Sequence, residues 1–171
     1  MVVRLLRAIL ILPGTALVLV PTALLWSFQA TALRAVPAGP GELRAWLGML
    51  LLACGLGFAV WTVRLFVQVG TGTPAPWDPP ERLVVEGPYR DVRNPMISGA
   101  LMMLAGGALL LGSCPIAVWL IVFFVGNALY FPLVEEKELR QRFGAAYEHY
   151  ADNVPRWLPR LTPWRRPDDG S

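Results

Sequence analysis

The sequence predicts an all-α integral membrane protein with about four transmembrane helices, a C-terminal helical hairpin and a cytoplasmic amphipathic extension. Of its 171 residues, 55% are hydrophobic and only 16% are charged, whereas soluble domains usually carry about 25% charged residues. The deficit is concentrated in four apolar segments, and the run from Asn94 to Val134 contains no charged residue at all. Basic residues gather between and after these segments. We expect one membrane domain over residues 1–171.

The first two apolar segments predict an N-terminal pair of helices within residues 1–69. The first is free of charge from Ala8 to Leu33. A cleaved secretory signal is the alternative, but the apolar region of such signals is only ~7–15 residues long, so we expect a retained helix. The second segment lies between Arg44 and Arg64 and is expected to extend to Val69.

The charge-free run predicts a hairpin of two further helices. It is about twice the ~20 residues that a helix needs to cross a bilayer, and Gly112–Pro115 interrupts it. We therefore expect helices near Pro95–Leu111 and Pro115–Val134. Because a hairpin returns to the side that it left, the polar residues just before the run should meet those just after it at one membrane face.

The distribution of basic residues predicts the orientation. Two connections remain. The one between the first two helices carries only Arg34 and Arg44, and the hairpin turn carries no basic residue. The positive-inside rule then places both termini and the long middle loop in the cytoplasm, in what we expect to be the inner (cytoplasmic) membrane. The net charge of +3 reflects this bias, and no nucleic-acid partner is expected. The basic residues before, between and after the helices are Arg4, Arg7, Arg82, Arg90, Arg93, Lys137, Arg140, Arg142, Arg156, Arg160, Arg165 and Arg166.

Cysteine and histidine usage argues against a metal site. The only cysteines are Cys54 in the second helix and Cys114 in the hairpin turn, and we expect two buried or near-buried free thiols. A lone His149 in a polar segment is expected to be a surface side chain. Zinc sites need clustered cysteine and histidine ligands, so no metal is expected.

Two segments outside the membrane helices have distinct patterns. The proline- and glycine-bearing stretch Gly70–Pro80 cannot form a helix. After Glu136, apolar residues recur at spacings of three and four, which predicts an amphipathic helix that Gly144 only weakens and Asn153–Pro155 ends. Arg156–Arg160 is expected to fold back along the interface, and residues 165–171 to be disordered. The recurring apolar residues are Leu139, Phe143, Tyr147 and Tyr150.

The pair Glu135-Glu136 is the first candidate for a functional site. A solvated helix end is the alternative interpretation, but acidic residues at a helix C-terminus oppose the macrodipole. The pattern continuing past the pair places it within a helix at the membrane boundary, where a carboxylate facing the bundle needs a partner. Arg93 is the nearest cation.

The polar residues before the hairpin complete this candidate cluster. Asn94 and Pro95 stand at the start of the third helix. Taken singly, Arg93 is explained as a snorkelling side chain and Asn94 as an N-cap. With Tyr89 and Arg90 nearby, we expect them to form one polar cluster with the distant glutamates. Gly99, Gly106 and Gly107 are expected to allow close helix contact.

These motifs, in this order, resemble a known family. Gly87-Pro88-Tyr89-Arg90-x-x-Arg93-Asn94-Pro95-Met96 is followed by the apolar hairpin, and then by Glu135-Glu136-x-x-Leu139-x-x-x-Phe143-Gly144-x-x-Tyr147-x-x-Tyr150 and Val154-Pro155-Arg156. The pattern is similar to that of the isoprenylcysteine carboxyl methyltransferase and phospholipid methyltransferase family. The resemblance covers about residues 70–160, within a methyltransferase-like core that we assign to residues 70–164.

The resemblance implies a membrane-bound methyltransferase that uses S-adenosylmethionine and a lipophilic small molecule or lipid as acceptor. It implies that Arg93 and Glu135 are catalytic. Two positions depart from the family pattern: Asn94 stands where many members have histidine, and Ile97 where many have tyrosine. An amide donates and accepts hydrogen bonds but does not titrate near neutral pH. The residues implied to bind the cofactor are Tyr89, Arg90, Arg93, Asn94, Pro95, Glu135 and Glu136.

Two alternative functions remain at this stage. One is a membrane reductase of the sterol-reductase type, which uses a nicotinamide cofactor but is generally longer than 171 residues. The other is a non-catalytic membrane scaffold in which the polar cluster only ties helices together. Binding of S-adenosylmethionine or of NADPH separates the three.

Overall fold

The computed structural model of the chain describes residues 7, 11, 13–70 and 81–164. Within these ranges every regular element is a helix and there is no strand, which confirms the all-α prediction. The basic residues Arg4, Arg165 and Arg166, the expected disordered tail and almost all of the proline-rich middle stretch lie outside the described residues.

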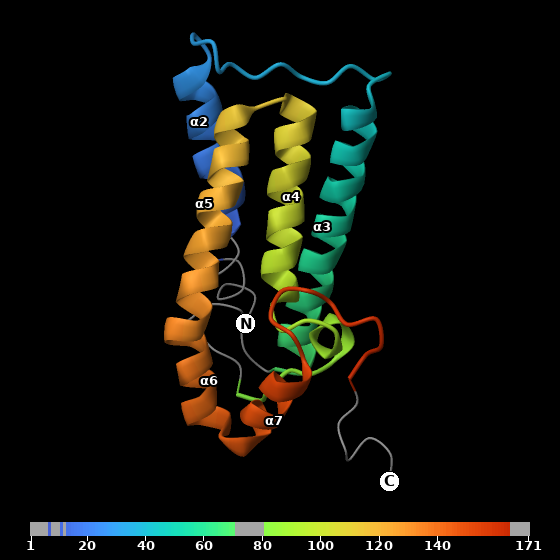
Figure 1. Cartoon of the computed structure of the whole chain (residues 1–171), viewed down its shortest axis with the longest axis vertical. Coiled ribbons are helices and arrows are strands. Elements are labelled where there is room, and N and C mark those ends of the chain that lie inside the picture. Colours follow the sequence, from blue (N-terminus) through green and yellow to red (C-terminus); the bar gives the residue numbers. More distant parts are fainter. Residues whose placement is uncertain (1–6, 8–10, 12, 71–80, 165–171) are drawn as a thin grey trace.

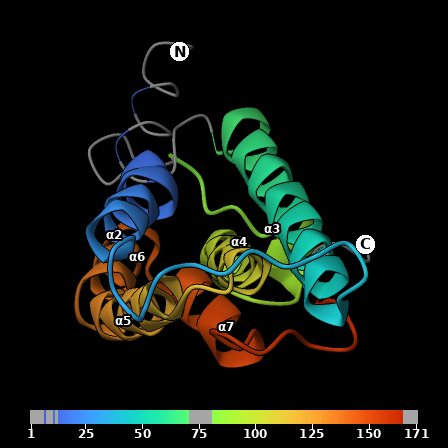
Figure 2. The same cartoon turned by 90° about the horizontal axis from the view of Figure 1, so that it is seen from above.

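The longer helical segments stand side by side (Figure 1). A short π-helix, η1 (Thr15–Leu19), leads into α2 (Val20–Phe28), and α3 (Leu43–Gln68) follows. The hairpin consists of α4 (Pro95–Leu111) and α5 (Cys114–Tyr130). Seen from above, α4 lies between α3 and α5, and α2 packs on α5 (Figure 2). The indole N–H of Trp119 in α5 donates to the Ala16 carbonyl at 2.9 Å, which ties η1 to α5.

The hairpin turn follows from its sequence. Gly112 caps α4 in the left-handed conformation, at φ 53°, which glycine adopts without steric cost. Ser113 then caps α5, because its hydroxyl accepts from the Ile116 amide at 3.5 Å, and a proline fills the first turn. The predicted bounds of both helices are therefore close to the observed ones.

Paired glycines bring α3 and α4 into close contact. Gly48 faces Gly106, and Gly55 faces Gly99, so the antiparallel helices meet at two points seven residues apart. A Cβ atom on Gly106 would lie 2.6 Å from the Gly48 carbonyl oxygen, and one on Gly55 would lie 2.6 Å from that of Gly99. The expectation of close contact is confirmed for Gly99 and Gly106, whereas Gly107 has nothing within 4 Å of such an atom.

The fourth helical segment continues past Glu135 and Glu136. After α5 the chain forms a π-helical turn, η3 (Phe131–Glu135), and then α6 (Glu136–Phe143). Pro132 within η3 has no amide hydrogen to donate, and a widened turn accommodates its ring. The extra residue in this turn rotates all that follows by about 100° relative to a regular α-helix.

The expectation that Gly144 only weakens one long amphipathic helix is wrong. Gly144 has φ 53° and ψ −132°, so α6 ends there and α7 (Ala145–Asn153) begins in a new direction. The break turns α7 back towards the bundle, where Tyr147 and Tyr150 are buried against Val85 and Val154. The apolar face predicted from the spacing is real, but it is divided between two short helices.

The outer surface of the bundle is apolar. Exposed large side chains run along α2, α3 and α5, among them Trp26, Leu50 and Ile121. Leu43–Gln68 and Cys114–Phe143 are long and apolar enough to cross a membrane, while Thr15–Phe28 and Pro95–Leu111 are shorter apolar helices. Both cysteines are free but lie on this exposed surface, so the expectation of buried thiols is wrong.

The glycine contact predicts a strong contrast between two neighbouring substitutions. Gly106→Ala should lower the melting temperature of the detergent-purified protein, because overpacking against the α3 backbone costs ~1–3 kcal/mol. Gly107→Ala introduces the same methyl group into open space and should leave stability unchanged or slightly higher. Equal melting temperatures for the two variants would contradict this account of α3–α4 packing.

Candidate functional site

The loop between α3 and α4 carries most of the predicted site residues. Val84 and Val85 are buried, and the 3₁₀-helix η2 (Gly87–Arg90) follows. Gly87 has φ 53°, and a Cβ atom there would lie 3.0 Å from the ring of Trp61 on α3. Glycine at this position therefore permits both the turn and the close approach of the loop to α3.

A buried ionic cluster joins the two ends of the hairpin. Arg93 Nη1 lies 3.1 Å from Glu136 Oε1. Arg156 donates from Nε to Glu136 Oε1 at 2.7 Å and from Nη2 to Oε2 at 3.0 Å, a two-pronged contact. The Glu136 side chain is only 8% exposed. The prediction that Arg93 meets the glutamate pair is confirmed for Glu136.

Tyr147 borders the same cluster. Burial raises the pKa of its hydroxyl, the nearby Glu136 carboxylate raises it further, and a hydrogen bond with Arg93 opposes the rise. The hydrogen bond to Glu136 likewise raises the pKa of Arg156. At neutral pH the raised pKa values therefore keep the Tyr147 phenol protonated and the Arg156 guanidinium charged.

Two buried donors in this cluster have no acceptor among the described residues. Asn94 is the N-cap of α4, but its side chain makes no capping hydrogen bond, and its buried Nδ2 has no partner in the part of the chain that the structure describes. The buried Nε of Arg93 also has none. Pro95 is fully buried beside them at the first position of α4. Because a buried donor without a partner costs ~1–3 kcal/mol, the arrangement suits an anionic or carbonyl group that is not part of the chain.

The two glutamates differ in their surroundings. Glu136 is fully engaged by two guanidinium groups. Glu135 ends η3 and is half-buried, and among the described residues its carboxylate has no hydrogen-bond or ion-pair partner. Glu135, and not Glu136, is therefore the glutamate that can accept hydrogen bonds from a ligand.

Tyr89 and Arg90 lie farther along the loop. The Tyr89 ring is buried with Leu65 and Val84 and stacks edge-on against Phe66 at 5.8 Å. Its carbonyl accepts a 2.8 Å hydrogen bond from the Tyr150 hydroxyl. Burial, more than any other cause, raises the pKa of Tyr89 well above its ordinary value. Arg90 is half-buried and directs Nε to the Val85 carbonyl at 3.4 Å.

The segment after α7 is tied across this loop. The Arg93 amide donates to the Pro155 carbonyl at 2.9 Å, the Arg160 amide to the Asp91 carbonyl at 2.9 Å, and the Trp164 amide to the Arg90 carbonyl at 3.0 Å. The predicted fold-back of Arg156–Arg160 is therefore directed onto the loop. The segment delivers Arg156 to Glu136.

Sequence reasoning placed Arg156 in the basic tail and in the family-like motif, but not in the site. Two signals pointed to it. The motif Val154-Pro155-Arg156 directly follows the helix that carries the buried tyrosines, and a buried carboxylate between two elements has room for a second cation. The sequence likewise places Tyr147 in an apolar face and in the family-like motif, but not in the site.

Removing the shared carboxylate should destabilise the fold. In Glu136→Gln, Arg93 and Arg156 would face each other without a counter-ion, and we expect a loss of about 3 kcal/mol in the free energy of unfolding. Glu138→Gln is the matched control, because Glu138 is exposed on the same helix. Thermal unfolding in detergent measures both, and equal melting temperatures would show that the cluster contributes nothing to stability.

Comparison with known proteins identifies the family. The model of the phospholipid methyltransferase family matches residues 43–146, which is more than half of the chain. No curated protein and no solved structure matches it. The match begins with α3, includes the loop and the hairpin, and ends in α7, so it contains every predicted site residue. The chain belongs to the phospholipid methyltransferase family.

Proposed function

We propose that this protein is an integral-membrane methyltransferase that transfers a methyl group from S-adenosylmethionine to a lipophilic acceptor. Family membership supports methyl transfer at a membrane. The observation that carries the cofactor assignment is a pair of buried donors at the ionic cluster, Arg93 Nε and Asn94 Nδ2, that have no acceptor within residues 13–70 and 81–164.

The residues present suit S-adenosylmethionine. Its amino-acid carboxylate is an acceptor of the kind that the Arg93 and Asn94 donors need. Its ribose hydroxyls can donate to the carboxylate of Glu135, which has no partner among the described residues. When bound, the cofactor supplies an activated methyl group on a positively charged sulfur.

Each residue then has a distinct proposed role. Arg93 binds the anionic group, and Glu135 holds the ribose. Glu136 and Arg156 position Arg93, because they fix its guanidinium at 3.1 Å from Glu136. Pro95 and Tyr89 shape the wall of the site, and Arg90 anchors the loop through Val85. Alignment of this kind contributes much of the rate of a bimolecular transfer.

An apolar groove supports a lipophilic acceptor. It has a volume of about 450 Å³ and lies between α3, α4 and α5, lined only by apolar side chains. Phe124 at this groove also contacts Trp157, with ring centroids 5.4 Å apart, and Trp157 contacts Phe131 at 5.8 Å. Because Trp157 follows Arg156 in sequence, this aromatic row leads from the groove to the ionic cluster. The groove-lining residues are Leu51, Leu101, Met102, Ala105, Leu120, Ile121 and Phe124.

Four membrane crossings with both termini in the cytoplasm complete the proposal. The two long helices and the two shorter apolar helices lie side by side (Figure 1). At 17 residues, α4 reaches the lower limit for a bilayer span. The basic residues before and after the hairpin then lie on the same face as the site, and that face is cytoplasmic by the positive-inside rule.

Cofactor binding tests the proposed roles directly. Calorimetric titration of the purified protein with S-adenosylmethionine or its demethylated product should show binding, and NADPH should show none. Glu135→Gln should weaken that binding about 10- to 100-fold, because a hydrogen bond to a charged group contributes ~1.5–3 kcal/mol. Glu138→Gln, three residues away and exposed, should bind normally. Unchanged affinity in Glu135→Gln would remove this residue from the site, and binding of NADPH alone would indicate a reductase.

The topology has its own test. In a protein with Cys54 and Cys114 replaced by serine, Ser171→Cys should react with a membrane-impermeant maleimide in inside-out vesicles and not in right-side-out vesicles. This result is expected because the positive-inside rule puts the C-terminus in the cytoplasm. Labelling only in right-side-out vesicles would reverse the orientation and move the proposed site to the other face.

A further inference from the structure

An amide side chain lies inside the apolar span that contains α5, away from the ionic cluster. Asn127 is half-buried in α5, within the span Cys114–Phe143. It stands nine residues before Glu136, which is about 13 Å along a helix. An amide among apolar side chains and lipid is costly unless its donors and its acceptor find partners. The position of Asn127 therefore requires a reason other than the ionic cluster.

The chain satisfies only part of this amide. Nδ2 of Asn127 donates to the Phe123 carbonyl, one turn earlier in the helix, at 2.7 Å. In the part of the chain that the structure describes, Oδ1 accepts no hydrogen bond. Because the nitrogen and the oxygen of an amide diverge from one carbon, the bond from Nδ2 to the helix directs Oδ1 away from it. The residue is half-buried and not enclosed, so a ligand inside the bundle can reach this oxygen.

Asn127 belongs to the inner face of α5. Along the helix, residues at spacings of three and four from Ile116 to Phe131 are buried or half-buried, whereas Val125 and Leu129 on either side of Asn127 are exposed. Side chains with this spacing share one side of a helix. The amide therefore faces the bundle and not the surrounding lipid. The inner-face residues are Ile116, Leu120, Phe123, Asn127 and Phe131.

The same face places Asn127 between the apolar groove and the ionic cluster. Phe124 lines the groove and contacts the Trp157 ring at 5.4 Å, and Phe131 contacts that ring at 5.8 Å. Asn127 follows Phe124 by three residues and precedes Phe131 by four, so it stands between the two aromatic contacts. A lipophilic molecule that extends from the groove towards the cluster therefore passes this amide.

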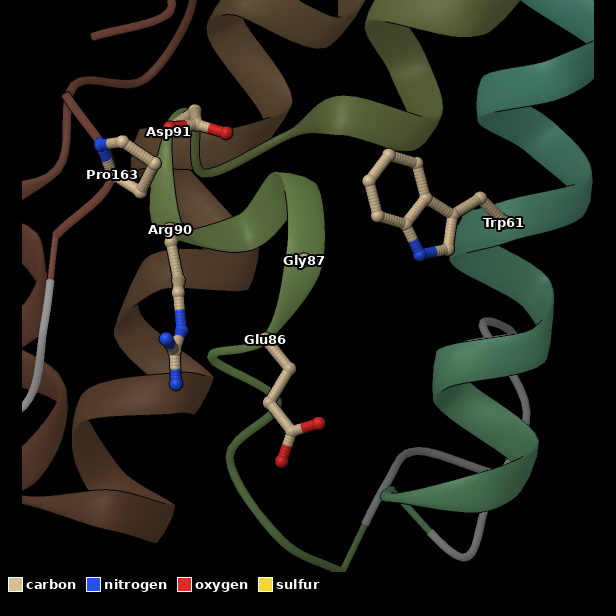
Figure 3. Close-up of a pocket in the computed structure, with 6 residues that line it drawn as sticks. All are labelled: Trp61, Glu86, Gly87, Arg90, Asp91 and Pro163. Atoms are coloured by element: carbon tan, nitrogen blue, oxygen red, sulfur yellow. The ribbon is translucent and has the colours of Figure 1, made fainter. Parts of the chain in front are cut away.

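A second cavity, beside η2, has a different lining. Its volume is about 480 Å³, and Trp61 of α3 and Pro163 of the C-terminal segment border it together with the η2 residues (Figure 3). Glu86, Asp91 and Arg90 bring charged groups to its wall. The groove, in contrast, is lined only by apolar side chains. The apolar part of an acceptor therefore favours the groove and the path along Asn127.

We propose that Asn127 determines acceptor specificity, because its Oδ1 accepts a hydrogen bond from an O–H or N–H group of the acceptor whose apolar part lies in the groove. The role in methyl transfer rests on the proposed function, whereas the hydrogen bond forms without any transfer. An amide does not titrate near neutral pH, so Asn127 orients the acceptor and does not take its proton. A site that hydrogen-bonds one group of a ligand discriminates against analogues that lack the group.

Two photoreactive probes of equal length test this proposal on the full chain. One is dodecanol with a diazirine in its chain, and the other is its methyl ether, which cannot donate a hydrogen bond. In the detergent-purified protein, the alcohol should label the segment from Phe123 to Phe131 about three- to tenfold more than the ether, because one hydrogen bond contributes about that factor. Labelling around Trp46, an exposed residue near the other end of α3, is the reference for partition into the micelle and should be equal for both probes.

Variants of Asn127 separate a ligand contact from a structural contact. Asn127→Leu should abolish the preference for the alcohol and melt at the same or a higher temperature, because it replaces an incompletely bonded amide by an apolar side chain. Asn127→Asp keeps an oxygen acceptor and should keep most of the preference. Trp119→Phe is the matched control: it removes a different side-chain hydrogen bond of α5, to the Ala16 carbonyl, and should keep the preference.

Three outcomes would overturn the role of Asn127. These are equal labelling by the two probes in the wild-type protein, a preference that survives in Asn127→Leu, and a loss of preference in both Asn127 variants together with lower melting temperatures, which would assign the amide to the fold. Titration with S-adenosylmethionine in parallel separates the two proposals. Absent cofactor binding with the preference intact refutes only the proposed function, and cofactor binding without the preference refutes only the role of Asn127.

Discussion

Glu136 is bound by two arginines that come from segments far apart in the chain, and the arrangement of the polar end of the molecule depends on this contact. Arg93 comes from the start of α4, and Arg156 from the segment after α7. A single carboxylate therefore joins the hairpin to the C-terminal segment. Backbone hydrogen bonds from Arg93, Arg160 and Trp164 then hold that segment against the loop.

The excess of positive charge in this cluster connects structure with the proposed chemistry. Two guanidinium groups share one carboxylate, and two buried donors, Arg93 Nε and Asn94 Nδ2, have no acceptor among the residues that the structure describes. A fold alone gains nothing from such donors, since each costs free energy when it is buried without a partner. Their persistence is most simply explained by an anionic ligand group, which is why family membership and local geometry lead to the same proposal. The tyrosines around the cluster, with their raised pKa values, contribute neutral hydroxyl groups.

The loop between α3 and α4 serves two regions at once. Its end at Arg93 and Asn94 faces the ionic cluster, and Glu86, just before η2, borders a cavity that is also lined by Trp61 of α3. The glycine pairs keep α3 close to α4, and thereby hold Trp61 at a fixed distance from the loop.

The sequence by itself determined the helical class, the bounds of the hairpin and the meeting of Arg93 with the glutamate pair, because charge-free length and a glycine–proline turn leave little choice in a bilayer. Only the tertiary structure decided which glutamate faces the cluster. The π-turn at Pro132 contains one extra residue, which rotates the helix that follows it. The positive φ of Gly144 divides the amphipathic helix, and the reversal of the chain there brings Arg156 to Glu136. Neither the rotation at Pro132 nor the break at Gly144 can be predicted from hydrophobic spacing, since both arise from backbone geometry that packing selects.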